Sequence, residues 1–155
     1  MSNRRPQPAK TQPLDLDRFL PYRLDILADG VSRALSGIYK QRYGLGVPEW
    51  RVLAHLGRFA PITARDIAAH SRMHKTKVSR AVAELERLGF VKRGDSHRDG
   101  REEPLSLTAA GRAAYDDLAP RAAAFVRELM QGFSAADARA LDALIDRLLA
   151  ALPKR

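Results

Sequence analysis

The sequence contains no cysteine in its 155 residues. Disulfide bonds, zinc sites with thiolate ligands and thiol redox switches all need a cysteine side chain, so the composition excludes these three kinds of site. A chain without disulfides also fits the reducing environment of the cytoplasm. The length suits one domain with a real hydrophobic core, and it is too short for two independent cores.

Long apolar runs are also missing. No stretch approaches the roughly 20 apolar residues that cross a membrane. The first basic residues, Arg4 and Arg5, are followed by proline, glutamine and alanine instead of the apolar run of a secretory peptide. We therefore expect a cytoplasmic protein. Residues 1–13 (MSNRRPQPAKTQP) mix prolines with basic residues, which predicts a disordered basic arm.

The sequence has no clear catalytic or metal-binding motif. His70 and His74 have the spacing of a zinc-binding HExxH helix, but Ser71 stands where that motif has glutamate. A turn is also predicted between the two histidines. The adjacent carboxylates of Asp116 and Asp117 would diverge on a helix, and we interpret them as solvated charges. Because no nucleophile, base and orienting group come together, we expect neither an enzyme nor a bound cofactor or metal ion.

Acidic residues are few relative to basic ones. The chain has 27 Lys and Arg against 18 Asp and Glu, which gives a net charge of +9 and an isoelectric point near 10.5. Residues 63–101 alone hold ten basic and five acidic residues, and hence a net charge of +5. A basic excess concentrated in one segment indicates a polyanionic partner.

That basic segment begins with two short amphipathic stretches. Thr63 stands three residues before Asp66, which is the spacing of a capping box at a helix start. The second stretch, residues 74–88, carries apolar residues at helical spacing, and Gly89 supplies a left-handed stop. The residues expected to face inward are Ile67 and Ala68 in the first stretch, and Val78, Ala81, Val82, Leu85 and Leu88 in the second.

The other face of the second helix is polar and cationic at its N-terminal end. Its residues are Lys75, Thr76, Lys77, Ser79 and Arg80. This surface suits the major groove of DNA, because Arg80 can bond guanine O6 and N7 together, hydroxyls can bond base edges and lysines can neutralise phosphates. The alternative is a solvated cationic helix face, and the helix alone does not decide between the two.

Two strand-like runs follow, joined by a polar loop. Residues 90–93 form the first run and residues 104–107 the second, in which Leu105 and Leu107 alternate with Ser106. The order helix, turn, helix, hairpin predicts a winged helix-turn-helix. An arginine steadied by a carboxylate at the loop tip fits a narrow minor groove, and a loose charged turn is the alternative. The loop residues concerned are Arg98, Asp99 and Arg101.

A resemblance to the MarR family of dimeric transcription regulators is carried by the run DIAAHSRMHKTKVSRAVAELERLGFVKRGDSHRDGREEPLSLTAAGR. This run resembles the family's DNA-binding core, from the KTKVSR start of a recognition helix to LSLTAAG at the next helix start. The resemblance implies that Arg101 enters the minor groove with Asp99 orienting it. It also implies that the major groove is met by Thr76, Lys77, Ser79 and Arg80. His74 departs from the acidic or small polar residue that often caps this helix in the family, which leaves its capping role open.

Amphipathic helices are predicted before this core. One has Pro21 in its first turn and runs to about Tyr43, and the next runs from Val47 to near Phe59. Both precede the helix-turn-helix and extend the mainly α character of the chain. Together with the hairpin, they predict a mainly α fold with a small β wing.

Two more helices are predicted after the hairpin. Thr108 is a natural cap for a long helix, which Pro120 should kink or interrupt near Ala119. Ser134 caps a final helix, with Asp137 as its capping-box partner.

The terminal helices carry apolar stripes that a small winged helix-turn-helix cannot bury. At about 25 cal/mol per Å², an exposed stripe is costly in a monomer. Pairing the helices of two chains predicts a homodimer whose recognition helices lie about 34–36 Å apart, one turn of a palindromic operator. The predicted division is a basic arm (1–13), an N-terminal dimerisation helix (14–46), a winged helix-turn-helix (47–107) and C-terminal dimerisation helices (108–155).

The family resemblance further implies a small-molecule pocket between the dimerisation helices and the DNA-binding unit, often for an aromatic acid and sometimes for its coenzyme A thioester. In this chain Tyr22, Arg23, Trp50 and Arg51 offer aromatic walls and cationic partners for an anion, although each also fits a core or surface role. We therefore expect a ligand-responsive, sequence-specific regulator of transcription, most often a repressor in this family, released from double-stranded DNA by such a ligand. The alternative is a nonspecific architectural or RNA-binding winged-helix protein.

Overall fold

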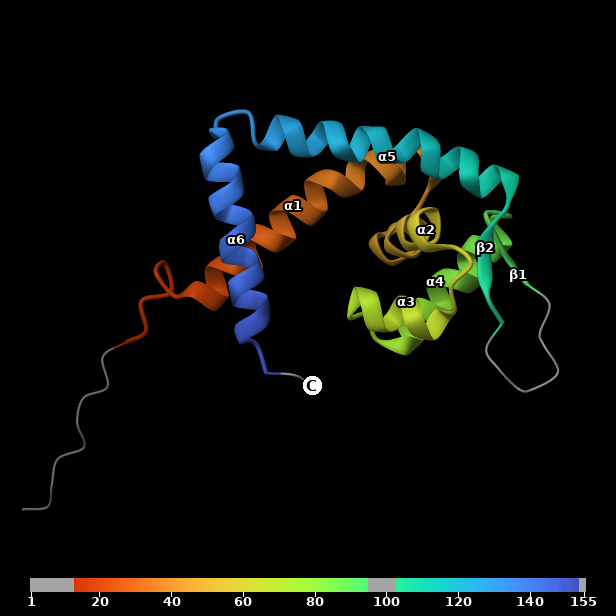
Figure 1. Ribbon diagram of the computed structural model, residues 1–155, viewed down its shortest axis with the longest axis horizontal. Coiled ribbons are helices and arrows are strands. Elements are labelled where there is room, and N and C mark those ends of the chain that lie inside the picture. Colours follow the sequence, from red (N-terminus) through yellow and green to blue (C-terminus); the bar gives the residue numbers. More distant parts are fainter. Residues whose placement is uncertain (1–12, 95–102, 154–155) are drawn as a thin grey trace, which may run out of the picture. The chain divides into compact units, whose positions relative to one another are not determined.

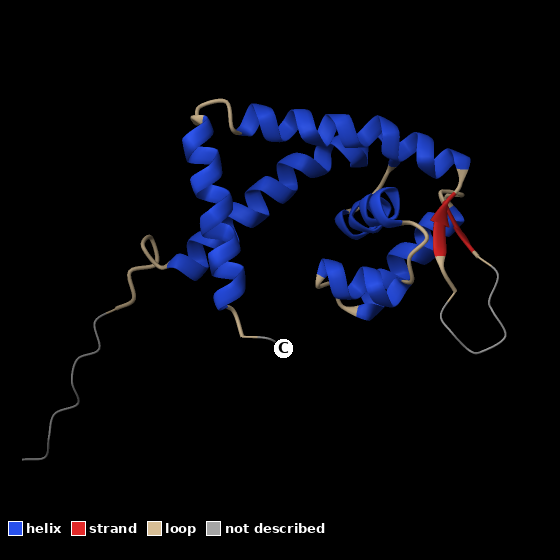
Figure 2. Ribbon diagram, viewed as in Figure 1, coloured by secondary structure: helices blue, strands red, loops and turns tan. Residues whose placement is uncertain are grey.

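The computed structural model describes residues 13–94 and 103–153 (Figures 1 and 2). In chain order the elements are α1 (Leu20–Tyr43), α2 (Val47–Phe59), α3 (Ala64–Ser71), α4 (Lys75–Arg87), β1 (Val91–Arg93), β2 (Leu105–Leu107), α5 (Ala109–Leu129) and α6 (Ala135–Ala151). This order confirms the predicted mainly α fold with a small β wing. The chain divides into two compact units, Met1–Ala34 and Leu35–Arg155, and each is described by itself. No helix in the described ranges is long and apolar enough to cross a membrane.

The hydrophobic core lies in the second unit and supports α4 from behind. Val52, Leu53 and Leu56 of α2 are fully buried, and the hairpin adds Val91 and Leu105. Full burial of an aliphatic side chain contributes about 1.5–3 kcal/mol, so this core holds α4 firmly in place. The residues predicted to face inward are buried, namely Ile67, Ala68, Val78, Ala81, Val82 and Leu85, and Leu88 packs partly buried against them.

Several helices begin at the side-chain caps that the sequence predicted. Thr63 Oγ1 accepts a hydrogen bond from the backbone N–H of Asp66 at 3.1 Å and starts α3. Thr108 caps α5 in the same way. Ser134 and Asp137 form a complete capping box at the start of α6, with each side chain bonded to the backbone of the other residue. Short-range spacing alone was therefore enough to place these three helix starts.

The hairpin is held to the core by a backbone bridge that the sequence did not predict. β1 pairs antiparallel with β2, so that Arg93 lies opposite Leu105. On the other side of β2, the N–H of Leu105 donates to the carbonyl of Ile62 at 2.9 Å, and the N–H of Ile62 donates back at 3.2 Å. Because Ile62 lies between α2 and α3, these two bonds tie the wing to the start of the helix-turn-helix.

The corner between α4 and β1 depends on two glycines. Gly89 ends α4 with a φ of +75°, a conformation that favours glycine, as predicted. The hydroxyl of Thr108 donates to the Gly89 carbonyl at 2.6 Å. A Cβ atom at Gly111 would overlap the carbonyl oxygen of Phe90, so α5 reaches this corner only because residue 111 has no side chain.

α5 runs through Pro120 as one helix, so that, of the kink or interruption predicted near Ala119, the interruption is wrong. Figure 2 shows the ribbon of α5 as continuous. Proline has no N–H, so the carbonyl of Asp116 loses its helical donor. Asp116 is exposed, and water can satisfy that carbonyl on the open side of the helix.

α6 presents its predicted apolar stripe to solvent. Of residues 135–151, all of which are described, none is buried. The stripe residues are each more than 40% exposed: Leu141 43%, Leu144 52%, Ile145 44%, Leu148 41% and Leu149 47%. A contiguous apolar surface of this kind marks an interaction site on a soluble protein.

Candidate nucleic-acid interface

α4 turns one face to the core and the opposite face to solvent. The side chains predicted to meet the major groove are all exposed, namely Lys75, Thr76, Lys77, Ser79 and Arg80. Beneath them, Val78, Ala81 and Val82 are almost fully buried. The helix therefore holds its polar face rigidly outward, which is the arrangement that a groove-reading helix needs.

The N-terminus of α4 is capped by His74, which answers the question that the sequence left open. Its Nδ1 accepts a hydrogen bond from the backbone N–H of Thr76 at 3.3 Å. The ring is exposed, so the cap sits at the surface beside the polar face of α4. The first turn contains no acidic residue, and the partial positive charge of the helix N-terminus adds to that of the lysines.

The positive charge of α4 is concentrated in its first half. Its only acidic residues, Glu84 and Glu86, lie in the second half, and both are paired. Arg87 donates two hydrogen bonds to Glu84, and these bonds lower the pKa of that carboxyl group. The described residues provide no ion-pair partner for Lys75, Lys77 or Arg80. These three cations are therefore available to an anionic partner.

The predicted minor-groove residues Arg98, Asp99 and Arg101 lie outside the described residues. The described part of the wing ends at Arg93 and Gly94 on one side and begins again at Glu103 on the other. The N–H of Gly94 donates to the carbonyl of Pro104 at 2.7 Å, which closes the base of the hairpin.

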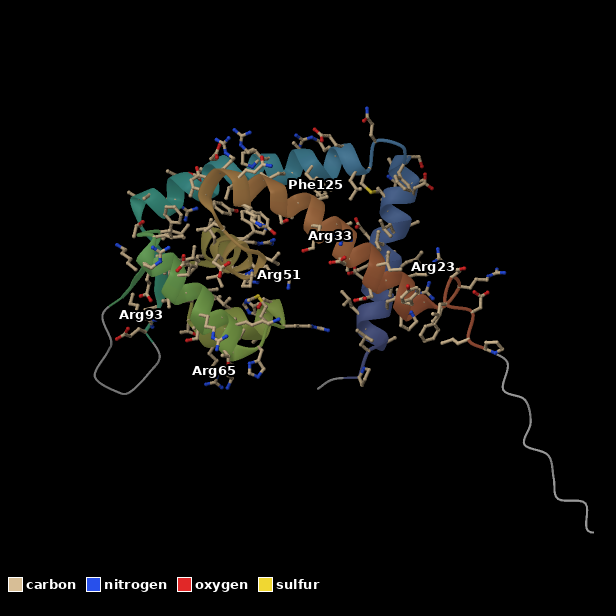
Figure 3. All side chains as sticks on the ribbon, turned by 180° about the vertical axis from the view of Figure 1, so that it is seen from behind. Arg23, Arg33, Arg51, Arg65, Arg93 and Phe125 are labelled. Carbon is tan, nitrogen blue, oxygen red and sulfur yellow. The ribbon has the colours of Figure 1, made fainter. Side chains whose placement is uncertain are left out.

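Arg93 connects this base to α4. Its Nε lies 2.8 Å from Glu86 Oε1 and its Nη2 lies 3.1 Å from Glu86 Oε2, a two-bond contact. The hydrogen bonds from the guanidinium to Glu86 raise the pKa of Arg93 above its ordinary value. Figure 3 shows Arg93 at the end of the hairpin strand, beside α4.

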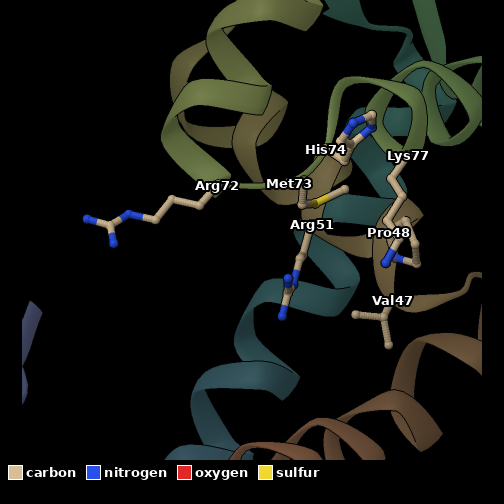
Figure 4. Close-up of a pocket in the computed structure, with 7 residues that line it drawn as sticks. All are labelled: Val47, Pro48, Arg51, Arg72, Met73, His74 and Lys77. Atoms are coloured by element: carbon tan, nitrogen blue, oxygen red, sulfur yellow. The ribbon is translucent and has the colours of Figure 1, made fainter. Parts of the chain in front are cut away.

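A cavity of about 380 Å³ opens beside the N-terminus of α4 (Figure 4). Its lining residues come from the start of α2, from the turn between α3 and α4, and from α4 itself: Val47, Pro48, Arg51, Arg72, Met73, His74 and Lys77. The lining contains three cationic side chains and no carboxylate. In Figure 4 the side chain of Arg72 extends away from the other lining residues.

Of the four residues predicted to line an effector pocket, only Arg51 lines this cavity. Trp50 instead stacks on Tyr39, with ring centroids 5.5 Å apart and the planes at 13°, and belongs to the core packing. Tyr22 and Arg23 lie at the start of α1 in the first unit and are exposed. The remaining lining residues were missed because the cavity is formed by a turn, whose conformation the sequence did not reveal. Arg72 takes a φ of +53° there, although it is not a glycine or an asparagine.

Asp117 is not the solvated charge that the sequence suggested. Arg42, at the end of α1, donates to it from Nε at 2.6 Å and from Nη2 at 3.1 Å. The Tyr43 hydroxyl and Arg121 Nε each donate at 3.1 Å. The hydrogen bond from Arg42 is the main cause that lowers the pKa of the Asp117 carboxyl group. Asp117 thus joins the end of α1 to the middle of α5.

Comparisons with known proteins agree with this architecture. A family model described as MarR family matches residues 43–102. An HTH-type transcriptional repressor of Mycobacterium tuberculosis is 36% identical over 124 residues, which make up 79% of this chain and 78% of that protein.

Solved structures give the same result for the fold. A MarR/EmrR family transcriptional regulator from Acinetobacter sp. ADP1 has a TM-score of 0.81 at 25% identity, over 88% of this chain and 96% of that one. MepR of S. aureus, in a complex with DNA, has a TM-score of 0.78 at 18% identity, over 86% of this chain and 98% of that one. The second likeness concerns the fold alone, because the identity is low.

Proposed function

Because this chain belongs to the MarR family of transcription regulators, we propose that it is a dimeric, sequence-specific repressor that a small organic anion releases from DNA. The observation that supports this proposal most strongly is the exposed face of α4. It combines hydroxyls with three cations that have no carboxylate partner among the described residues, on a helix fixed by a buried core.

The proposed roles follow from the chemistry of each side chain. Arg80 can reach guanine O6 and N7 with two parallel hydrogen bonds, while Thr76 and Ser79 bond other base edges. Lys75 and Lys77 neutralise phosphates next to the helix N-terminus. The minor groove is assigned to Arg101, oriented by Asp99 and assisted by Arg98, on the family resemblance stated above.

The proposed dimer rests on the apolar stripe of α6. An exposed stripe of five large aliphatic side chains is costly in water, and a second copy of the chain offers a matching surface. A two-fold dimer presents two recognition helices to two half-sites. Its operator would therefore be a palindrome with half-sites about one helical turn apart, roughly 34–36 Å.

The cavity beside α4 supports an anionic effector. Arg51 and Lys77 supply positive charge, and Val47, Pro48 and Met73 supply an apolar wall, which suits an aromatic carboxylate. A volume of about 380 Å³ lies near the lower end of ordinary ligand pockets and is too small to enclose a whole coenzyme A thioester. We therefore favour a small aromatic acid over its thioester.

Ligand and DNA would compete through shared residues. Lys77 both lines the cavity and belongs to the proposed DNA-contacting face. A ligand that prefers the DNA-free state by about 100-fold shifts the DNA equilibrium by up to roughly 2.7 kcal/mol, which is enough to release an operator bound at modest excess.

A titration of the DNA complex with a panel of aromatic acids and their coenzyme A thioesters tests the proposal. The protein is bound to a DNA fragment from upstream of its own coding sequence, and release is followed by fluorescence anisotropy at one salt concentration. We expect one aromatic acid to release wild type and to act far more weakly on Arg51→Ala. An Arg58→Ala variant, which loses an exposed arginine of the same helix outside the cavity, is the matched control. If no compound releases the DNA, or if both variants respond as wild type does, the effector site is wrong.

A further inference from the structure

One ion-pair cluster in the described chain joins the recognition helix to the wing. Glu86 lies next to the last residue of α4, Arg93 is the last residue of β1, and Glu103 lies two residues before β2. Arg93 contacts both carboxylates, with two hydrogen bonds to Glu86 at 2.8 and 3.1 Å and its Nε 3.9 Å from Glu103 Oε2. The cluster therefore links three consecutive elements at the point where the wing leaves the body of the protein.

The geometry of the Glu86 contact fixes an orientation as well as a distance. A guanidinium is planar, and two parallel hydrogen bonds to one carboxylate hold both groups in a common plane. A single lysine ammonium would fix only the distance. At the start of β1, Val91 is buried in the core and the N–H of Phe90 donates to the carbonyl of Leu85 at 2.9 Å, whereas the Glu86 contact fixes the far end of the strand, at Arg93.

Because this contact lies at the surface, it contributes little to the stability of the whole fold. The side chains of Arg93 and Glu86 are 46% and 29% exposed. Ion pairs at this exposure are screened by water and contribute little to the stability of the fold. A planar two-bond contact across two elements, at the base of the wing, is better explained by a positioning role.

We propose that Arg93 is a positioning residue for DNA recognition, which acts through Glu86 and Glu103 to hold the wing at a fixed angle to the recognition helix. This inference rests on the proposed function, because the angle matters only if helix and wing contact the same DNA molecule. When this angle is fixed, the recognition helix and the wing can reach their two grooves on the same DNA molecule at the same time. Without it, each contact still forms, but the operator loses its advantage over random DNA.

The sharpest test removes the pair without removing a positive charge. Glu86→Gln replaces the carboxylate that accepts both hydrogen bonds from Arg93, leaves only the longer contact with Glu103, and makes the protein one charge more positive. General electrostatics then predicts tighter binding to every DNA, whereas the positioning role predicts weaker binding to the operator. We expect Glu86→Gln to lose about tenfold in operator affinity, with unchanged or slightly tighter binding to random DNA.

The chain offers a matched control on the same helix. Glu84 has its own two-bond contact with Arg87, at 2.6 and 2.8 Å, and that pair lies entirely within α4. Glu84→Gln changes the charge by the same amount but leaves the wing untouched. We expect it to keep the operator preference of wild type. Equal behaviour of the two glutamine variants would overturn the proposal.

Two further variants separate positioning from direct phosphate contact. Arg93→Lys keeps the charge but loses the planar contact, so we expect a loss of operator preference with no change on random DNA. A double variant, Glu86→Arg with Arg93→Glu, exchanges the two charged groups. It should restore part of the operator preference that Arg93→Lys loses, because the planar pair can form again. Full operator binding by Arg93→Lys, or no recovery in the swap, would assign Arg93 to a phosphate contact instead.

A measurement without DNA separates failure of this inference from failure of the proposed function. Amide hydrogen exchange of residues 91–94 reports how firmly the hairpin base is held. We expect faster exchange there in Glu86→Gln than in Glu84→Gln, at equal thermal midpoints. If wild type prefers no DNA sequence, the proposed function fails, and the exchange comparison still decides whether Arg93 holds the wing. Equal exchange in both variants would overturn the inference.

Discussion

Among the residues of α4, we propose Arg80 as the main reader of DNA bases. It is exposed, and no described carboxylate competes for its guanidinium. Arg80→Ala should weaken binding to the operator by about 1–3 kcal/mol and leave binding to random DNA nearly unchanged. Affinities for both duplexes at one salt concentration check this prediction. Equal losses on the two duplexes would show that Arg80 contacts phosphate and reads no base.

Lys75 should behave in the opposite way. It is the first residue of α4, beside the helix N-terminus, where we propose that the lysine and the free amides bind the same phosphate. Lys75→Ala should weaken binding to all sequences alike. The slope of log affinity against log salt concentration should fall in magnitude by about one, since one fewer counterion is released. An unchanged slope would remove Lys75 from the contact.

For single residues, the sequence predicted exposure and burial but not the partners of a side chain in other elements. The exposure of Arg80 and the burial of Val78 follow from helical periodicity, and both were predicted. The partners of Asp117 were not, because Arg42 and Asp117 are 75 residues apart and local spacing says nothing of their contact. The stacking of Trp50 on Tyr39 was not predicted for the same reason, since Tyr39 belongs to another helix.

At the scale of elements, Asp117 joins the end of α1 to α5 and makes stability depend on pH. Its carboxyl pKa is lowered in the folded protein, mainly by the hydrogen bond from Arg42. A lowered folded-state pKa means that the contribution is fully present above the unfolded value of about 3.9 and is lost as the pH falls through the folded value. Asp117→Asn should therefore destabilise the protein at pH 7 and much less near pH 3.

Urea unfolding of wild type and Asp117→Asn at several pH values measures this difference. Asp116→Asn is the matched control, since Asp116 is exposed and no described residue forms an ion pair with it. A difference between wild type and Asp117→Asn that stays constant down to pH 3 would contradict the proposed role of the ionised carboxylate.

Element boundaries were predictable wherever a local cap defines them. Thr63, Thr108 and Ser134 start their helices as expected, and Gly89 ends α4. Elements that depend on tertiary contacts were not predictable. The bridge from Ile62 to β2 needs the two segments to meet in space, and the continuity of α5 through Pro120 runs against the local tendency of proline to end a helix.

At the scale of the whole molecule, the α6 stripe should govern both assembly and DNA affinity. Ile145→Asp places a charge on the exposed apolar stripe, and a charge buried without a partner costs several kcal/mol. The variant should sediment as a monomer at micromolar concentration and lose at least tenfold in operator affinity. Ala143→Asp adds the same charge on the opposite side of α6 and should remain a dimer. Dimeric Ile145→Asp would move the interface away from α6.

The cavity shows what whole-molecule geometry adds to sequence. Its walls come from three separate segments that meet only in the folded unit, and only Arg51 of the predicted set is among them. An anion pocket with aromatic walls and cationic partners was predicted at Tyr22, Arg23, Trp50 and Arg51, and that role stays a prediction. The location of the cavity, against the capped start of α4, required the structure.

We propose above all that this chain selects one DNA sequence over others. The most direct measurement compares the affinity of the purified protein for a fragment from upstream of its own coding sequence with its affinity for a scrambled duplex of equal length, at one fixed salt concentration. We expect a preference of about 10³-fold or more, as a specific regulator shows over its own nonspecific binding. Equal affinity for the two duplexes, with the operator present in the fragment, would contradict the claim and favour a nonspecific architectural protein.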